Sequence, residues 1–121
     1  MLSVNKLYAA SRSFSVSVPG FNGNVITPKV YKDNYGVNQK LNNVAIKPAK
    51  DELDFMLLKY FKNGETKPAS AYSPIIDGGN YTISGGISTS NLENNVYYAL
   101  KISSKLHYVS NTKVSGIHNA N

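Results

Sequence analysis

The sequence predicts a small all-β domain, and three observations lead to this fold class. Apolar and polar residues alternate along several short runs, clusters of glycine, proline and asparagine separate these runs, and the clusters recur about every ten residues. The 121 residues are enough for one domain with an apolar core of its own. We therefore expect a five-stranded β-barrel or a closely related sheet.

The alternation is clearest near the N-terminus. Residues 14–18 alternate apolar side chains with serines, which is the period of a strand and not of a helix. Residues 1–20 also resemble a mitochondrial presequence, because they contain Arg12, many serines and no acidic residue. The alternation favours the strand, and residues 1–12 then form an N-terminal extension.

The middle of the chain contains one turn signal and one ambiguous run. Residues 32–36 are rich in turn formers and are expected to form the tip of a hairpin, followed by a strand that Pro48 ends. Residues 53–61 fit either a short helix or a strand, because a continuous apolar run of this length has no decisive period. Asn63-Gly64 ends this segment in either case.

The last alternating run begins at Val96 and continues through Tyr108, which predicts a final strand. A helix over residues 91–106 is the alternative. The chain is divided into an N-terminal extension (1–12), a β-domain (13–110) and a polar tail (111–121) that is expected to fray. The expected core includes Val16, Val44, Leu57, Ile83, Leu100 and Ile102.

Residues that carry chemistry are scarce. The chain has no cysteine, which excludes disulfides, thiolate zinc sites and thiol nucleophiles. His107 is expected on a strand surface and His118 in the polar tail, so neither suits catalysis. The acids at positions 51, 52 and 54 fit a solvated turn better than a metal site. We expect no enzyme activity, no metal and no cofactor. We also expect no membrane partner, because no apolar run approaches the ~20 residues of a membrane span.

The chain is basic, with 13 lysines and arginines against 7 aspartates and glutamates and a net charge of +6. The excess lies mainly in the N-terminal half, which favours an anionic partner on that side of the molecule. A merely soluble basic protein is the alternative. The cations of the first fifty residues are Lys6, Arg12, Lys29, Lys32, Lys40, Lys47 and Lys50, against the single acid Asp33.

Aromatic residues are the second sign of a binding function. Nine tyrosines and four phenylalanines occur without a tryptophan, and several neighbour a lysine, as in Tyr31–Lys32, Lys59–Tyr60 and Phe61–Lys62. Proteins that bind single-stranded nucleic acid combine cations for the phosphates with aromatic rings on which bases stack. Tyrosine is also a good strand former, so each tyrosine taken alone has a structural explanation. Its combination with the basic half favours binding of single-stranded nucleic acid.

The order of several stretches resembles the small helix-destabilising single-stranded-DNA-binding proteins of filamentous phages, of the gene-five type. The first stretch is the alternating Phe-Ser-Val-Ser-Val strand, and the second begins Tyr-Gly-Val-Asn and leads into a core strand. The third contains a lysine-bearing strand, a glycine turn, Tyr-Ser-Pro and a Tyr-Thr strand, and the last is a closing strand. The matching stretches are residues 14–18, 35–46, 57–83 and 100–109.

The resemblance implies a five-stranded barrel of the oligonucleotide-binding type with an extended hairpin wing. It also implies a homodimer that coats single-stranded DNA cooperatively during phage replication, in the cytoplasm of a bacterial host. Tyr35 matches a wing tyrosine that contacts DNA, Lys59 a strand lysine near the DNA, and Lys105 a basic residue of the last strand. Lys29 and Lys32 add positive charge on the same wing.

Two other functions fit parts of the sequence. A virion structural protein, such as a coat or decoration subunit, would explain the asparagine, serine, glycine and tyrosine in short strands, and a basic face against a packaged genome. A mitochondrial matrix protein would explain the presequence-like N-terminus. An enzyme is a distant third, because no catalytic constellation can be assembled.

Overall fold

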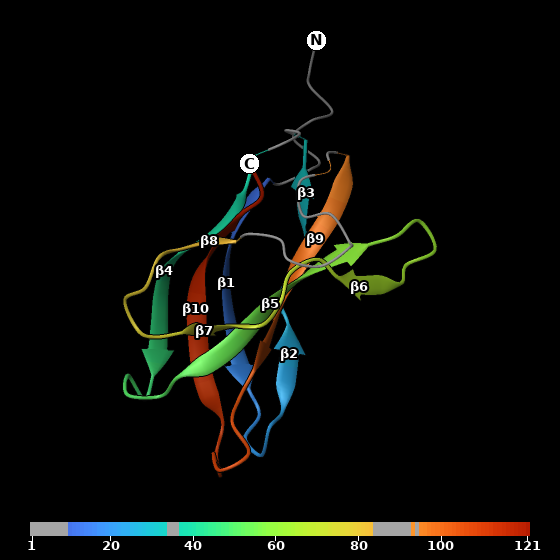
Figure 1. Ribbon diagram of the computed structural model, residues 1–121. Coiled ribbons are helices and arrows are strands. Elements are labelled where there is room, and N and C mark those ends of the chain that lie inside the picture. Colours follow the sequence, from blue (N-terminus) through green and yellow to red (C-terminus); the bar gives the residue numbers. More distant parts are fainter. Residues whose placement is uncertain (1–9, 34–36, 84–92, 94) are drawn as a thin grey trace.

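The all-β class predicted from the sequence is confirmed. The computed structural model describes residues 10–33, 37–83, 93 and 95–121, and these residues form antiparallel strands and no helix (Figure 1). No helix in this part of the chain is therefore long and apolar enough to cross a membrane. The strands are β1 (Ser11–Val18), β2 (Asn24–Ile26), β3 (Val30–Lys32), β4 (Gln39–Lys47), β5 (Leu53–Tyr60), β6 (Thr66–Pro68), β7 (Ser73–Ile75), β8 (Tyr81–Ile83), β9 (Val96–Ser103) and β10 (Thr112–Asn119).

The strands are arranged in two sheets. The four-stranded sheet has the order β1-β10-β4-β8, and the six-stranded sheet has the order β2-β9-β5-β6. In the second sheet β2 and β3 follow each other along one edge of β9, and β7 and β6 follow each other along the free edge of β5. If β2 and β3 are counted as one interrupted strand, and β6 and β7 as another, the described residues form eight strands. The resulting order is that of a two-sheet jelly roll.

This arrangement differs from the expected five-stranded barrel with a hairpin wing. β3 pairs with β9, whereas β4 pairs with β10 and β8, so the two strands lie in different sheets. The segment between Lys32 and Gln39 therefore connects the sheets, and its residues 34–36 lie outside the described residues. Strand alternation alone does not specify which strands pair, because pairing depends on contacts between distant parts of the chain.

The expectation of a frayed polar tail is wrong, because β10 lies in the interior of the four-stranded sheet between β1 and β4 (Figure 1). Val114 of β10 is opposite Val16 on one side and Ile46 on the other. The inward-facing positions of β10 also include Gly116, which lies opposite Phe14, and a Cβ added there would lie only 3.2 Å from the Phe14 ring. Small and polar residues at these core positions hide the strand from a hydrophobic-period analysis.

The predicted core is otherwise confirmed. Five of its six residues are buried, and Val16 is partly buried against them. Residues 53–60 form a strand, which settles the ambiguity between helix and strand, and the Asn63-Gly64 turn joins β5 to β6. The last predicted run ends earlier than expected, because β9 stops at Ser103 and a turn follows from Lys105 to Tyr108.

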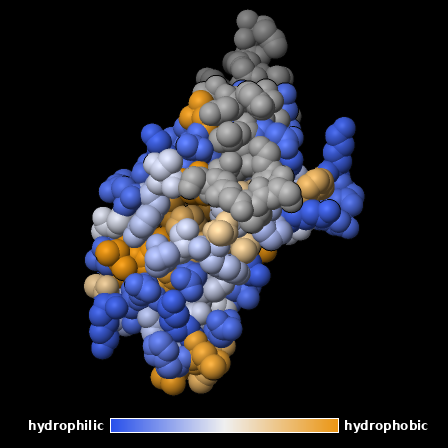
Figure 2. All heavy atoms as spheres, in the orientation of Figure 1, coloured by the Kyte–Doolittle hydropathy of each residue, from blue (hydrophilic) through white to orange (hydrophobic). Residues whose placement is uncertain are grey.

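One end of the molecule carries exposed apolar side chains. The turn after β1 and the loop after β9 are joined there by a hydrogen bond from Phe21 N to Tyr108 O, 2.6 Å long. Phe21, Leu106 and Val109 on these loops are 66%, 73% and 75% exposed. Figure 2 shows apolar side chains gathered at the end where the loops lie, and a second apolar group partway up the same face.

The interior near the opposite end contains a buried histidine. His118 is on an inward position of β10, and its Nε2 lies 2.8 Å from Gln39 Oε1 on β4. The neutral ring therefore donates from Nε2, and Nδ1 has no hydrogen-bond partner among the described residues. Burial lowers the pKa of His118 to about 3, because a charged imidazolium would be desolvated there.

This burial makes stability depend on pH. The unfolded chain binds a proton at His118 near pH 6.5, whereas the folded chain does so only near pH 3, so stability decreases as the pH falls between these values. The expected loss is about 1.4 kcal/mol of unfolding free energy per pH unit in this window. Urea unfolding at pH 7 and pH 5 measures it, with His118→Gln as the matched control. An equal loss in the wild type and the variant would contradict the assignment.

Candidate functional site

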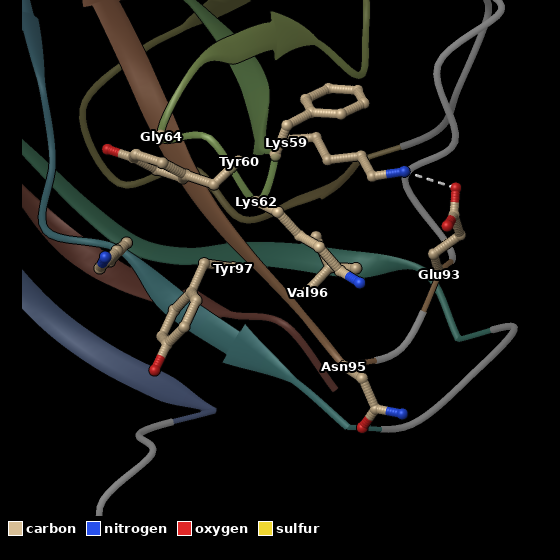
Figure 3. A pocket seen from close by; sticks show the side chains of 10 residues that line it. Lys59, Tyr60, Lys62, Gly64, Glu93, Asn95, Val96 and Tyr97 are labelled. Carbon is tan, nitrogen blue, oxygen red and sulfur yellow. Dashed lines mark hydrogen bonds and ion pairs between the residues drawn. The ribbon is translucent and has the colours of Figure 1, made fainter.

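The main candidate site is a cavity of about 480 Å³ on the six-stranded sheet, which we call the tyrosine–lysine pocket (Figure 3). Its walls come from the end of β5 and the turn after it, from the start of β9, and from the residue before β3. The lining residues are Lys29, Lys59, Tyr60, Phe61, Lys62, Gly64, Glu93, Asn95, Val96 and Tyr97.

One wall of the pocket holds a cation over two aromatic rings. Lys29 Nζ lies 4.6 Å from the ring centroid of Tyr97 and 5.3 Å from that of Tyr60. Tyr31 lies opposite Tyr97 in the β3–β9 ladder, and their rings meet edge to face with centroids 5.0 Å apart. Cation–π attraction orients the Lys29 ammonium over Tyr60 and Tyr97, and the contact with Tyr31 orients the Tyr97 ring.

The other wall contains an ion pair. Lys59 Nζ is 2.5 Å from Glu93 Oε2, and Figure 3 shows this pair across the pocket from Tyr60 and Tyr97. Lys59 and Lys67 both place their ammonium groups 5.2 Å from the ring centroid of Phe61. The Lys59 charge is thus offset by a carboxylate, while Lys62 is exposed beside it.

The arrangement suits a ligand that is anionic and has flat rings. Lys29 and Lys62 are exposed cations that can neutralise phosphates. Tyr60 and Tyr97 are partly exposed, and Phe61 is 37% exposed, so their rings offer stacking surfaces. No group of three histidine, cysteine or acidic side chains fit to hold a metal occurs in the part of the chain described here.

Two of the five residues expected from the sequence meet in this pocket, namely Lys29 and Lys59. Lys32 lies elsewhere, fully buried, with Nζ 2.5 Å from Val37 O and 2.6 Å from Ala120 O. The reason is the strand period: β3 directs Val30 and Lys32 inward and Tyr31 outward. Burial lowers the pKa of Lys32, although the neighbouring Asp33 carboxylate opposes this shift.

Lys105 and Tyr35 are the remaining expected residues. Lys105 Nζ pairs with Asp54 at 3.1 Å and with Glu52 at 3.8 Å, on a different part of the surface from the pocket. The hydrogen bond to Asp54 is the main reason why the pKa of Lys105 is raised. Tyr35 lies outside the described residues. The third acid of this group, Asp51, accepts a hydrogen bond from the Thr112 hydroxyl.

Tyr60, Phe61 and Lys62 are aromatic–lysine neighbours in the sequence but were not among the expected site residues, and neither was Tyr97. A signal for Tyr97 is present in the sequence. In the run from Val96 to Ile102 the inward positions are 96, 98, 100 and 102, so Tyr97 is on the outward phase. A large aromatic residue on the solvent side of a strand is a candidate for binding.

A scan against protein-family models and a search of curated proteins both find nothing similar to this chain. We therefore infer the function from the geometry of the site and from the strand order.

Lys32 has a structural role, and its removal tests this. Replacing Lys32 by Ala leaves two carbonyl oxygens, those of Val37 and Ala120, without their donor. We expect the variant to lose about 2–4 kcal/mol of unfolding free energy, measured by urea unfolding. Lys29→Ala is the exposed control and should change stability by less than about 0.5 kcal/mol. If the Lys32→Ala variant is as stable as the Lys29→Ala variant, the buried structural role of Lys32 is contradicted.

Proposed function

We propose that this protein binds single-stranded nucleic acid at the tyrosine–lysine pocket, in a sequence-tolerant way and without catalysis. The observation that carries the proposal is the Lys29 ammonium held over the rings of Tyr60 and Tyr97, with Lys62 exposed on the same pocket. The homodimer and the role in phage replication rest on the family resemblance and stay predictions, whereas the strand order differs from that of the five-stranded barrel that the resemblance implies.

The chemistry of the pocket favours a single strand over other anions. A free phosphate would use the lysines but not the tyrosine rings, and a duplex keeps its bases stacked inside the helix. An unpaired strand presents both phosphates and base faces, and each stacked base contributes about 1–3 kcal/mol to such complexes. Ring stacking and phosphate contacts do not read base edges, which is why sequence tolerance is expected.

A second function, that of a virion coat subunit, is favoured by the strand order. Two antiparallel sheets with the order of a jelly roll are an architecture found in viral capsid proteins, lectin domains and cupins. This support is an analogy of fold, and one fold serves many functions. The two proposals are compatible if a coat subunit contacts a packaged single strand. Sedimentation with single-stranded DNA separates them, since a coat subunit forms closed particles and a coating protein forms filaments.

Substitution of Tyr97 tests the pocket directly. We expect Tyr97→Ala to weaken binding of a dye-labelled oligothymidylate by about 1–3 kcal/mol, measured by fluorescence anisotropy, because one stacking ring is lost. Tyr97→Phe keeps the ring and should bind nearly as tightly as the wild type.

Lys105→Ala is the matched control for charge. Its ammonium is already paired with Asp54 and Glu52, so its removal should leave the oligothymidylate affinity almost unchanged. Equal affinity of the Tyr97→Ala variant and the wild type would contradict the proposed site. If Lys105→Ala reduces the oligothymidylate affinity more than Tyr97→Ala does, the binding site lies on the surface around Lys105 and not at the tyrosine–lysine pocket.

A further inference from the structure

The outer face of the four-stranded sheet has a composition unlike that of the pocket. The serines at the odd positions of β1 are all exposed there, and they are followed across the sheet by Lys113 and Ser115 of β10 and by Ala45 and Lys47 of β4. We call this surface the serine–lysine face. It is formed by Ser11, Ser13, Ser15, Ser17, Lys113, Ser115, Lys40, Ala45 and Lys47. None of its strands, β1, β10, β4 and β8, carries an acidic residue.

Two lysines of this face are direct cross-strand neighbours. Lys113 of β10 is opposite Lys47 of β4, and both are exposed. Like charges placed directly opposite in an antiparallel pair are destabilising, so this pair has a cost for the isolated protein. A shallow cavity of about 220 Å³ lies beside the pair and is lined by both lysines, Ser15, Ala45 and Ser115. Hydroxyl groups and two cations thus converge on one small hollow, and neither lysine forms an ion pair within the described part of the chain, although Ile46 N beside Lys47 donates a hydrogen bond to Asp77 Oδ1.

We propose that the serine–lysine face is a second nucleic-acid surface, which binds the phosphate backbone and not the bases. A phosphate between Lys47 and Lys113 would turn their mutual repulsion into attraction to a shared anion, and hydroxyls such as that of Ser15 would donate hydrogen bonds to its oxygens. The outward positions of β1, β10 and β4 hold no aromatic ring on which a base could stack. This face therefore binds duplex and single strands alike.

The face fits a nucleic-acid backbone better than a lipid surface. Peripheral binding to membranes needs apolar side chains that insert between lipids as well as cations. The serine–lysine face offers short hydroxyls instead, with Ile117 as a partly buried exception. The proposal shares its class of partner with the tyrosine–lysine pocket, but it concerns the opposite sheet and can fail or succeed independently.

The experiment uses a short duplex DNA as the probe, because a duplex offers phosphates but no unstacked bases. The double variant Lys47→Gln/Lys113→Gln should bind the duplex more weakly at low salt in fluorescence anisotropy. The slope of log K, the logarithm of the association constant, against the logarithm of the salt concentration should become less negative by about 1.8, because each lost phosphate contact changes this slope by about 0.9. The variant should also melt at a temperature equal to or above that of the wild type, because the repulsion is gone.

Lys62→Gln is the matched control, since Lys62 lines the tyrosine–lysine pocket. It should reduce affinity for oligothymidylate and leave duplex affinity unchanged. The double variant binding the duplex as tightly as the wild type would overturn the second surface, and so would tighter binding of the wild type to anionic phospholipid vesicles than to DNA. Loss of duplex binding in the double variant, with no effect of Lys62→Gln on oligothymidylate, would keep the second surface and reject the pocket.

Discussion

The burial of one face of each sheet in a single apolar core is the constraint on which the rest of the structure depends. Leu57 and Leu100 meet across β5 and β9, and Val114 and Ile46 meet across β10 and β4, with these side chains all buried. Because strand side chains alternate between faces, this burial also decides where each lysine points. The alternation that places Tyr31 on the outside of β3 places Lys32 on the inside. A charged residue in the sequence therefore contributes to the surface charge only where its strand position faces outward.

Much of the strand content could be predicted from the sequence, and the pairing could not. The Ser/Phe/Val alternation of residues 13–18 and the run from Val96 to Ile102 locate β1 and most of β9, since their inward residues are apolar. β10 was hidden because Gly116 and His118 occupy core positions without an apolar side chain. Gly116 is there because Phe14 covers it from β1, a contact between residues far apart in the chain.

The candidate site was predictable in its chemistry and only partly in its residues. Local neighbours such as Lys59 and Tyr60 were visible as an aromatic–lysine cluster. Whether a lysine is free for a ligand depends on long-range partners, as in the pairing of Lys105 with Asp54, 51 residues away in sequence. The meeting of Lys29 with Tyr97 depends in the same way on the β3–β9 ladder. The outer surfaces of the two sheets thus differ in composition, with aromatic rings and cations on the six-stranded sheet and hydroxyls and cations on the four-stranded sheet.

The most direct test of the account is ultraviolet crosslinking of oligothymidylate to the full chain, with the crosslinked residues identified by mass spectrometry. Short-range crosslinks report contact between a base and a side chain, so they map stacking and not general attraction to phosphates. We predict crosslinks at Tyr60, Phe61 or Tyr97, on the tyrosine–lysine pocket. Crosslinks confined to the strands β1 and β10, or to the apolar loops around Phe21 and Leu106, would contradict it.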